Sequence, residues 1–309
     1  MTPEAENADA VLALKRGELI ILPTETVYGL AADASNGEAV ARIFEAKGRP
    51  RFNPLIAHVA DAAAAERIAV FDAAARRLAE VFWPGPLTIV APVRDRQAVC
   101  DLARAGLDTV AVRVPGHARA REILAAFGGP VVAPSANRSG RPSPTTFADA
   151  LEETGPAASA GVDGGPCAVG VESTVVSIID GGVSLLRPGS VTRADLAEAL
   201  GAEVGHGAGG GHRSPGRLAT HYAPEAPVRI EADGPGADEA YLAFGPTKID
   251  TPWNLSPSGD LREAAANLFR MLREADRTRP KGIAVAPVPR EGLGEAINDR
   301  LKRAAGFVG

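Results

Sequence analysis

Short hydrophobic runs alternate with stretches of helical periodicity over the first two thirds of the chain. The runs that predict strands lie at 18–23, 55–59, 86–93, 109–114, 130–135, 173–179 and 183–187. Helical patterns lie between or after them at 37–48, in two Ala-rich stretches within 61–82, and at 117–127, 147–153 and 193–200. Because so many strands follow one another closely, mixed pairing is expected rather than a purely parallel series. The pattern therefore predicts an α/β fold with a twisted mixed sheet and flanking helices.

The pattern breaks at 205–216, where GHGAGGGHRSPG has no periodicity and is dominated by glycine. Such a composition is typical of a flexible linker. Beyond it, the order strand, strand, helix, strand, helix predicts a small Rossmann-like α/β unit. The sequence thus predicts a large domain over 1–204, a linker or lid over 205–226 and a small α/β domain over 227–309.

Composition narrows the class of protein. The length of 309 residues favours two domains. With 45% hydrophobic and 23% charged residues, the composition is that of an ordinary folded protein. A net charge of -5 argues against a protein that coats nucleic acid, although a local basic pocket is still allowed. The two cysteines, Cys100 and Cys167, have neither disulfide-framework nor zinc-site spacing. No run is long enough for a membrane span and the start lacks a signal-peptide pattern, so we expect a cytoplasmic protein.

Polar residues follow the first predicted strand directly. Thr24, Glu25, Thr26 and Tyr28 come immediately after the run at 18–23. One interpretation is a capped turn shaped by the neighbouring proline and glycine. The other is a pocket wall whose hydroxyl groups hold a small polar ligand, because ligands of open α/β sheets bind beyond the ends of strands.

A basic segment follows the helix predicted at 37–48. Lys47, Arg49 and Arg51 alternate along it, and neighbouring prolines restrict its backbone. Cations suit the carboxyl end of a helix, where they complement its dipole. On a stiff loop they also have the chemistry of a polyphosphate clamp.

One predicted strand carries an arginine among hydrophobic residues. Thr109 and Arg113 lie four positions apart, so both face the same side of the strand, opposite the intervening valines. An arginine buried there needs an anionic partner, because an unpaired buried charge is very costly. That partner is either a structural carboxylate or the carboxylate of a ligand. His58, in an earlier hydrophobic run, is more typical of a core histidine than of a catalyst when taken alone.

Later strands also end in polar clusters. The loop after 130–135 is either an exposed loop or a site for phosphate or ribose. For the clusters around 172–174 and 187, strand-edge pairing is the simpler interpretation. The residues just after the glycine-rich stretch form either a lid, an adenine-stacking contact or a docking segment. The residues of these clusters are Ser135, Asn137, Arg138, Ser139, Arg141 and Ser143, then Glu172, Ser173, Thr174 and Arg187, then Arg217, His221 and Tyr222. Since no P-loop, GxGxxG, GxSxG or HExxH motif is present, we expect catalysis by positioning and charge neutralisation.

Seven motifs taken in order resemble the YrdC-like domain of the threonylcarbamoyl-AMP synthases. They are PTETVYGL, KGRP with NPL, WPGPLT, VAVRVP, PSANRSG with SPT, ESTVV and LRPGS. The resemblance covers about residues 8–200, and the continuation with SPGRLATHYAP and a small α/β domain is similar to the longer two-domain form of the family. It implies a YrdC-like twisted mixed sheet with flanking helices, followed by a small Rossmann-like domain.

The resemblance also implies an activity. L-Threonine, bicarbonate and ATP would give L-threonylcarbamoyladenylate and pyrophosphate, with Mg²⁺ on the triphosphate. Other proteins would transfer the threonylcarbamoyl group to tRNA, so this protein need not bind nucleic acid stably, and no membrane is involved. Lys47 and Arg49 are expected to be the catalytic cations. The residues that match threonine-contacting positions are Thr26, His58, Arg113 and Ser173, and Tyr28 is expected to line the same pocket. Those expected on the nucleotide side are Lys47, Arg49, Asn53, Thr109, Ser135, Asn137, Ser143, Arg187 and Tyr222.

No residue is an obvious general base, and no protein metal ligand is assigned. The family's linker motif often carries an extra lysine and arginine where this chain has RLATHY, which leaves Arg217 and His221 as substitutes. Two other functions compete with the synthase. One is a non-enzymatic double-stranded RNA binding module, against which the net charge weighs. The other is carbamoyl transfer from carbamoyl phosphate, but YrdC-like proteins of that kind carry additional segments that this chain lacks.

Overall fold

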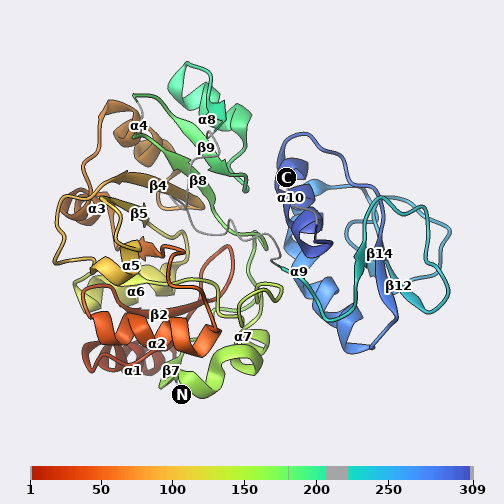
Figure 1. The fold of residues 1–309 in the computed structure, drawn as a ribbon, viewed down its shortest axis with the longest axis horizontal. Helices are drawn as coiled ribbons and strands as arrows, with labels where there is room; N and C mark the ends of the chain where they lie inside the picture. Colours follow the sequence, from red (N-terminus) through yellow and green to blue (C-terminus); the bar gives the residue numbers. More distant parts are fainter. Residues whose placement is uncertain (1, 180, 207–221, 307–309) are drawn as a thin grey trace.

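A computed structural model describes residues 2–179, 181–206 and 222–306 of the protein (Figure 1). It contains two units, each built around its own sheet. The elements of the N-terminal unit are α1 Pro3–Lys15, β1 Ile20–Leu22, β2 Gly29–Asp33, α2 Gly37–Lys47, β3 Ile56–His58, α3 Ala62–Ile68, α4 Ala73–Phe82, β4 Leu87–Pro92, α5 Asp101–Arg104, β5 Thr109–Arg113, α6 Ala118–Phe127, β6 Val131–Val132, α7 Phe147–Thr154, the 3₁₀ helix Gly155–Ala157, β7 Ala160–Gly161, β8 Thr174–Ser177, β9 Ser184–Arg187, α8 Arg193–Leu200 and β10 Gly205–His206. Those of the C-terminal unit are β11 Val228–Arg229, β12 Glu239–Ala243, β13 Trp253–Asn254, α9 Leu261–Arg277, β14 Gly282–Val285 and α10 Leu293–Ala304.

The N-terminal sheet has ten strands in the order β10-β9-β8-β4-β5-β3-β6-β2-β1-β7. Parallel and antiparallel pairs alternate irregularly within it, so the predicted mixed sheet is confirmed. The strands present alternate residues to two faces. One face supplies the main core, as with Ala57 of β3 and Val112 of β5. On the other face, α1 and α6 cover the part formed by β1, β2 and β6.

Helix α1 and strand β2 are among the elements that were not predicted from the sequence. The inward-facing residues of α1 lie only in its second half, at Ala10, Val11, Ala13 and Leu14, so its first turns show no hydrophobic stripe. Strand β2 consists mostly of glycine and alanine, which have weak strand propensity. It forms because it pairs with β1 on one side and β6 on the other.

Helix α2 positions the basic segment that follows it. Asn36 caps its first turn by accepting hydrogen bonds from two backbone N–H groups, and Val40, Ile43 and Phe44 face the core. Gly48 ends the helix with φ of +59°, a left-handed conformation that glycine adopts without strain. The backbone therefore turns away directly after Lys47, and Arg49 begins a separate loop.

A β-bulge turns Arg187 toward the same face as Val175. Strand β9 pairs with β8 through Val175↔Arg187 and Val176↔Leu185, so one extra residue, Leu186, interrupts the register. Leu185 and Val176 both belong to the main core. If β9 continued in regular register without the bulge, Arg187 would share the face of Leu185, because residues two apart point to the same side of a strand.

The C-terminal unit is a four-stranded parallel sheet in the order β11-β14-β12-β13, on which α9 and α10 pack. The predicted small α/β fold is thereby confirmed. Residues 205–206 still pair with β9 of the N-terminal sheet, and residues 207–221 of the predicted linker, including Arg217 and His221, lie outside the described residues.

The two units are joined by hydrophobic contacts and buried ion pairs. Val27 and Val171 of the N-terminal unit belong to the hydrophobic cluster of the C-terminal unit. Arg273 of α9 donates to Glu153 of α7 at 2.9 Å, with both side chains almost fully buried. Burial of such charges is tolerated because each has its partner.

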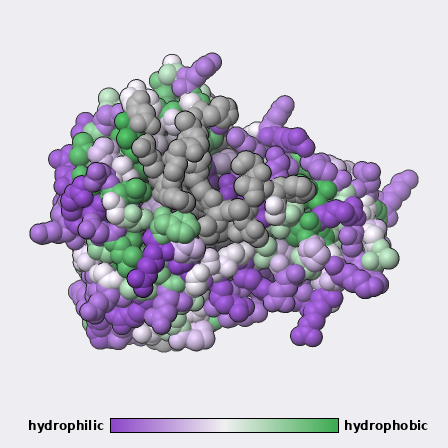
Figure 2. All heavy atoms as spheres, in the orientation of Figure 1, coloured by the Kyte–Doolittle hydropathy of each residue, from purple (hydrophilic) through white to green (hydrophobic). Residues whose placement is uncertain are grey.

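Among the described residues, no helix is both long and apolar enough to cross a bilayer. Figure 2 shows mostly hydrophilic residues over the visible face of both units, with hydrophobic ones in small separate groups.

The contact at Gly170 leads to a prediction about how the units fit together. Gly170 has φ of +77°, and a Cβ atom there would lie 2.3 Å from Ala266 Cα of α9. Gly165 has the same φ, but a Cβ atom there would meet nothing within 4 Å. We expect Gly165→Ala to lower the free energy of unfolding by about 1 kcal/mol. Gly170→Ala should cost at least about 2 kcal/mol more, because backbone must move. Urea unfolding of both variants measures the difference, and equal losses would contradict the close approach.

Candidate active site

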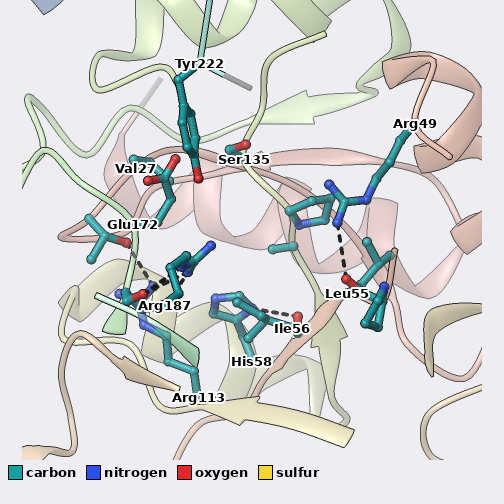
Figure 3. A pocket seen from close by; sticks show the side chains of 15 residues that line it. Val27, Arg49, Leu55, Ile56, His58, Arg113, Ser135, Glu172, Arg187 and Tyr222 are labelled. Carbon is teal, nitrogen blue, oxygen red and sulfur yellow. Dashed lines mark hydrogen bonds between the residues drawn. The ribbon is translucent and has the colours of Figure 1, made fainter. Parts of the chain in front are cut away.

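A pocket lies over the face of the N-terminal sheet opposite the main core (Figure 3). Ile56 and His58 of β3 and Arg113 of β5 reach it because they alternate with core residues along their strands. The site therefore lies over a face of the sheet as well as at strand ends. Its lining residues are Thr26, Val27, Arg49, Pro54, Leu55, Ile56, His58, Arg113, Ala133, Pro134, Ser135, Glu172, Ser173, Arg187 and Tyr222.

Arg113 is held in place by three partners. Its Nε donates to the carbonyl of Gly85 at 3.2 Å, Nη1 to Thr26 Oγ1 at 2.9 Å and Nη2 to Glu25 Oε1 at 2.6 Å. Burial raises the pKa of the Glu25 carboxyl, but the charge and hydrogen bond of Arg113 outweigh it and hold that pKa below its ordinary value. Arg113 thus has a structural carboxylate partner, and a guanidinium group has five N–H donors, so two are left for a ligand.

Thr26 is positioned by its own segment. Its hydroxyl lies 2.8 Å from Thr24 Oγ1, which also donates to the carbonyl of Val27 at 2.6 Å. These bonds form the turn that was one of the two interpretations of this sequence. Both interpretations apply, because the turn presents Thr26 to the pocket.

His58 lies beside Arg113, since the two residues are direct partners across β3 and β5. Burial, followed by the charge of Arg113, lowers the pKa of His58 to about 3. The imidazole is therefore neutral at pH 7. With Nδ1 3.1 Å from the carbonyl oxygen of Ile56, it is suited to orient a ligand rather than to supply charge.

Arg187 and Ser173 form the part of the pocket next to β8. Arg187 Nη2 donates to the carbonyl of Ser173 at 2.9 Å and to its hydroxyl at 3.0 Å. The hydroxyl also lies 2.8 Å from Thr88 Oγ1. The bulge in β9 makes this contact possible, because it turns the guanidinium toward the pocket.

Arg49 stands on the stiff loop after α2. It donates from Nε to the carbonyl of Asn53 at 3.4 Å and from Nη2 to that of Pro54 at 3.2 Å. Burial lowers its pKa to about 10, so it keeps its charge at pH 7. Neither partner is anionic, which leaves the positive charge available to a ligand. Asn53 is buried on the same loop, and its side-chain amide has no hydrogen-bond partner among the described residues.

Tyr222 reaches the pocket from the segment before β11. It is 1% exposed, and its ring lies 5.3 Å from that of Phe269 in α9. Burial, then the charge of Glu172, raises the pKa of its hydroxyl to about 12. Figure 3 shows its ring entering the pocket above Glu172.

Several residues predicted for the site do not line this pocket. Lys47 is buried, and its Nζ donates to the carbonyl oxygens of Ser135, at 2.5 Å, and of Asn137. It therefore ties the loop after β6 to α2. Burial, followed by the charge of Arg49, lowers the pKa of Lys47 well below its ordinary value.

The others support neighbouring loops. The hydroxyl of Tyr28 donates to the carbonyl of Gly165 at 2.7 Å, and the Asn137 amide donates to Arg138 and Arg141 carbonyls. Ser143 donates to Glu172 at 2.5 Å. Thr109 begins β5, on the same face as Arg113 but at the opposite end of the strand. The pocket does bring together eight of the predicted site residues, which are Thr26, Arg49, His58, Arg113, Ser135, Ser173, Arg187 and Tyr222.

Sequence reasoning assigned no role to two acidic residues of this region, Glu25 and Glu172. Glu172 was noted within the ESTVV motif, but its partner Arg300 lies 128 positions away on α10. Arg300 had no local signal, since Arg303 on the same amphipathic helix looks equivalent in the sequence. The one available sign in the sequence was that Glu172 is a carboxylate among residues predicted to be cationic, so it would need a cation of its own.

The arrangement can bind anions and stabilise developing negative charge. Arg49, Arg113 and Arg187 are rigidly held cations, and Thr26, Ser135 and Ser173 add hydroxyl groups. Glu172 is the pocket's single carboxylate among the described lining residues, and no described group of three or more His, Cys, Asp or Glu side chains could hold a metal ion.

Comparisons with known proteins match this sequence and fold. The family described as "Telomere recombination" matches residues 12–189, and "Threonylcarbamoyl-AMP synthase, C-terminal domain" matches residues 191–306. The threonylcarbamoyl-AMP synthase of Bacillus subtilis is 37% identical over 99% of this chain and 94% of its own. That of Pyrococcus abyssi is 38% identical over 95% of this chain and 92% of its own. The crystal structure of P. abyssi Sua5 complexed with L-threonine matches with a TM-score of 0.90 at 36% identity, over 99% of this chain and 96% of that one.

Fold and relatives together define a two-unit enzyme of the nucleotidyltransferase type. The chain belongs to the threonylcarbamoyl-AMP synthase family, in its long form. The resemblance found in the sequence is thereby confirmed.

The buried neutral state of His58 leads to a prediction about pH. The ordinary pKa of histidine is 6.5, whereas that of folded His58 is about 3. Between these values the unfolded chain binds a proton that the folded chain does not, so acidification should favour unfolding by up to about 1.4 kcal/mol per pH unit. Above pH 6.5 this contribution to stability is fully present. We expect His58→Gln to flatten the decline in unfolding free energy from pH 6.5 to 4. A slope identical to that of the wild type would contradict a neutral His58.

Proposed function

We propose that this protein condenses L-threonine, bicarbonate and ATP to L-threonylcarbamoyladenylate and pyrophosphate. The observation that carries the proposal is one pocket with two kinds of cationic group. Arg113 stands among hydroxyls and a neutral imidazole, whereas Arg49 and Arg187 stand near a buried tyrosine. The first group suits an amino acid and the second a nucleotide phosphate chain. Threonine in the complex of P. abyssi Sua5 supports the same choice of amino acid.

Threonine would bind at the floor of the pocket. Arg113 would take the carboxylate through its remaining N–H groups, and Thr26 and Ser173 would hydrogen-bond the ligand. His58, neutral and fixed against Ile56, would orient it without repelling the amine by charge.

ATP would bind across the rest of the pocket. Arg49 and Arg187 would pair with its phosphates, and Tyr222 would pack against the nucleotide. Ser135 would contact it from the loop that Lys47 holds. Mg²⁺ would enter with the triphosphate, whose charge it would partly neutralise. Asn53, whose buried amide has no described partner, is available to the same ligand.

The reaction would take place in two steps. Bicarbonate takes up a proton and loses water to give carbon dioxide. The neutral amine of threonine then attacks its carbon, so that a C–N bond forms as one C–O π bond opens, and the amine releases one proton. An oxygen of the new carbamate then attacks the α-phosphorus of ATP, and the bond to the β-phosphate oxygen breaks in line. Arg49 and Arg187 would stabilise the charge that collects on the departing pyrophosphate.

The product is a mixed anhydride, which is an activated donor of the threonylcarbamoyl group. We propose that separate tRNA threonylcarbamoyl-transfer proteins consume it to modify an adenosine of tRNA. An acidic protein suits this division of work, because this step does not require binding of tRNA.

The direct test is release of pyrophosphate from ATP. We expect release only when both L-threonine and bicarbonate are present, because the attacking carbamate needs both. The measurement is a coupled pyrophosphate assay in which each reactant is omitted in turn. Release that does not depend on threonine would refute the synthase. Salt-sensitive binding of double-stranded RNA without turnover would favour a binding module instead.

A pair of variants should separate the two ligands. Because Glu25 would be left unpaired, Arg113→Gln is made together with Glu25→Gln, with Glu25→Gln alone as its control. We expect the double variant to raise the KM for threonine at least about tenfold beyond the control while the KM for ATP changes little. Arg187→Gln should raise the KM for ATP while the KM for threonine changes little. If both variants raise both KM values equally, the assignment of the two cations is wrong.

A further inference from the structure

The pocket contains a carboxylate where the proposed function places an anionic ligand. Glu172 lines the pocket, is 6% exposed and stays ionised, because the charges of Arg300 and Arg187 outweigh the effect of burial and hold its pKa below the ordinary value. An unneutralised carboxylate here would repel a triphosphate. Its presence therefore requires an explanation that the reaction itself does not supply.

Arg300 of the C-terminal unit neutralises this carboxylate. Its Nε donates to Glu172 Oε2 at 3.0 Å, and Nη1 donates to the carbonyl of Pro188 at 2.7 Å and to Asp299 at 2.9 Å. The Arg300 side chain is 0% exposed. On the other side, Ser143 donates to Glu172 Oε1 at 2.5 Å. Both oxygens of Glu172 are thus held from outside the pocket.

Arg187 is the alternative partner of Glu172. It lines the same pocket, yet among the described residues the ion pair of Glu172 within 4.0 Å is with Arg300. Arg187 instead donates to the uncharged carbonyl and hydroxyl of Ser173. Figure 3 shows Glu172 and Arg187 as neighbours on one side of the pocket.

We propose that Arg300 is a positioning residue of the nucleotide site. By binding Glu172, it keeps that carboxylate from pairing with Arg187, so that Arg187 can bind an anionic ligand. Arg300 also lies over the ring of Tyr222, with 5.6 Å from its guanidinium carbon to the ring centroid, and so contacts a second pocket residue. The C-terminal unit thereby takes part in substrate binding without contacting the substrate. The inference rests on the proposed function for the identity of the ligand.

The test replaces Arg300 with an uncharged residue of similar length. In Arg300→Met, Glu172 loses its partner and takes Arg187, so we expect the KM for ATP to rise at least about tenfold while the KM for threonine changes less. Affinity for a non-hydrolysable ATP analogue, measured by calorimetry, should fall by the same factor.

A second variant supplies the rescue. In Glu172→Gln with Arg300→Met, the unpaired carboxylate of the pocket is gone and Asp299 keeps its ion pair with Arg303, so affinity for the ATP analogue should return to within about threefold of the wild type. A purely structural role of Arg300 predicts no such recovery. Failure of the double variant to recover would overturn the proposal.

Arg273→Met is the matched control. Arg273 is also buried and joins the units through an ion pair with Glu153, but neither residue lines the pocket. We expect it to lower thermal stability without changing affinity for the ATP analogue. If it weakens that affinity as much as Arg300→Met does, the effect is one of unit docking and the proposal is wrong.

The binding measurement separates this proposal from the proposed function. If the wild type binds the analogue with the predicted dependence on Arg300 but releases no pyrophosphate with threonine and bicarbonate, the synthase reaction fails and the role of Arg300 stands. If pyrophosphate release depends on threonine but Arg300→Met binds the analogue normally, the synthase reaction stands and the role of Arg300 is refuted.

Discussion

Burial of several arginines around one pocket is the constraint on which the rest of the structure depends. A guanidinium group taken out of water must have its donors satisfied, because an unpaired buried charge is very costly. Arg113 is satisfied by Glu25, Thr26 and a carbonyl, whereas Arg49 and Arg187 rely mainly on carbonyl oxygens. Carbonyls satisfy donors but cancel no charge. The pocket therefore stays positive where the proposed phosphate chain would lie and nearly neutral where the amino acid would lie.

The same constraint gives the C-terminal unit a role beyond packing. Its helices contribute Arg273 and Arg300, each of which meets a buried carboxylate of the N-terminal unit. Val27, adjacent to Thr26, belongs to the hydrophobic cluster of the C-terminal unit. One segment of chain thus belongs both to the pocket wall and to the hydrophobic core of the C-terminal unit. A change in the packing of that core would therefore move the pocket wall.

The sequence predicted most of the fold and the part of the site that depends on strand alternation. An arginine in an alternating strand must face a polar partner, so the pattern singled out Arg113 but left open whether that partner was a structural carboxylate or a ligand. Lys47 could not be separated from Arg49 in this way, because the loop carbonyls that it binds come from 88 and 90 positions away. The partnership of Glu172 with Arg300 was equally hidden, since it depends on how two units dock. Contacts within an element can be predicted from periodicity, whereas contacts between distant elements need the three-dimensional arrangement.

The bulge at Leu186 has a consequence for how this protein can change during evolution. Since the bulge decides which way Arg187 points, a change that let β9 pair in regular register, with Leu186 opposite Val175, would turn this proposed phosphate-binding cation from the pocket toward the core. The register of β9 is thus tied to the proposed chemistry of the pocket, whereas its hydrophobic residues serve the packing of the core.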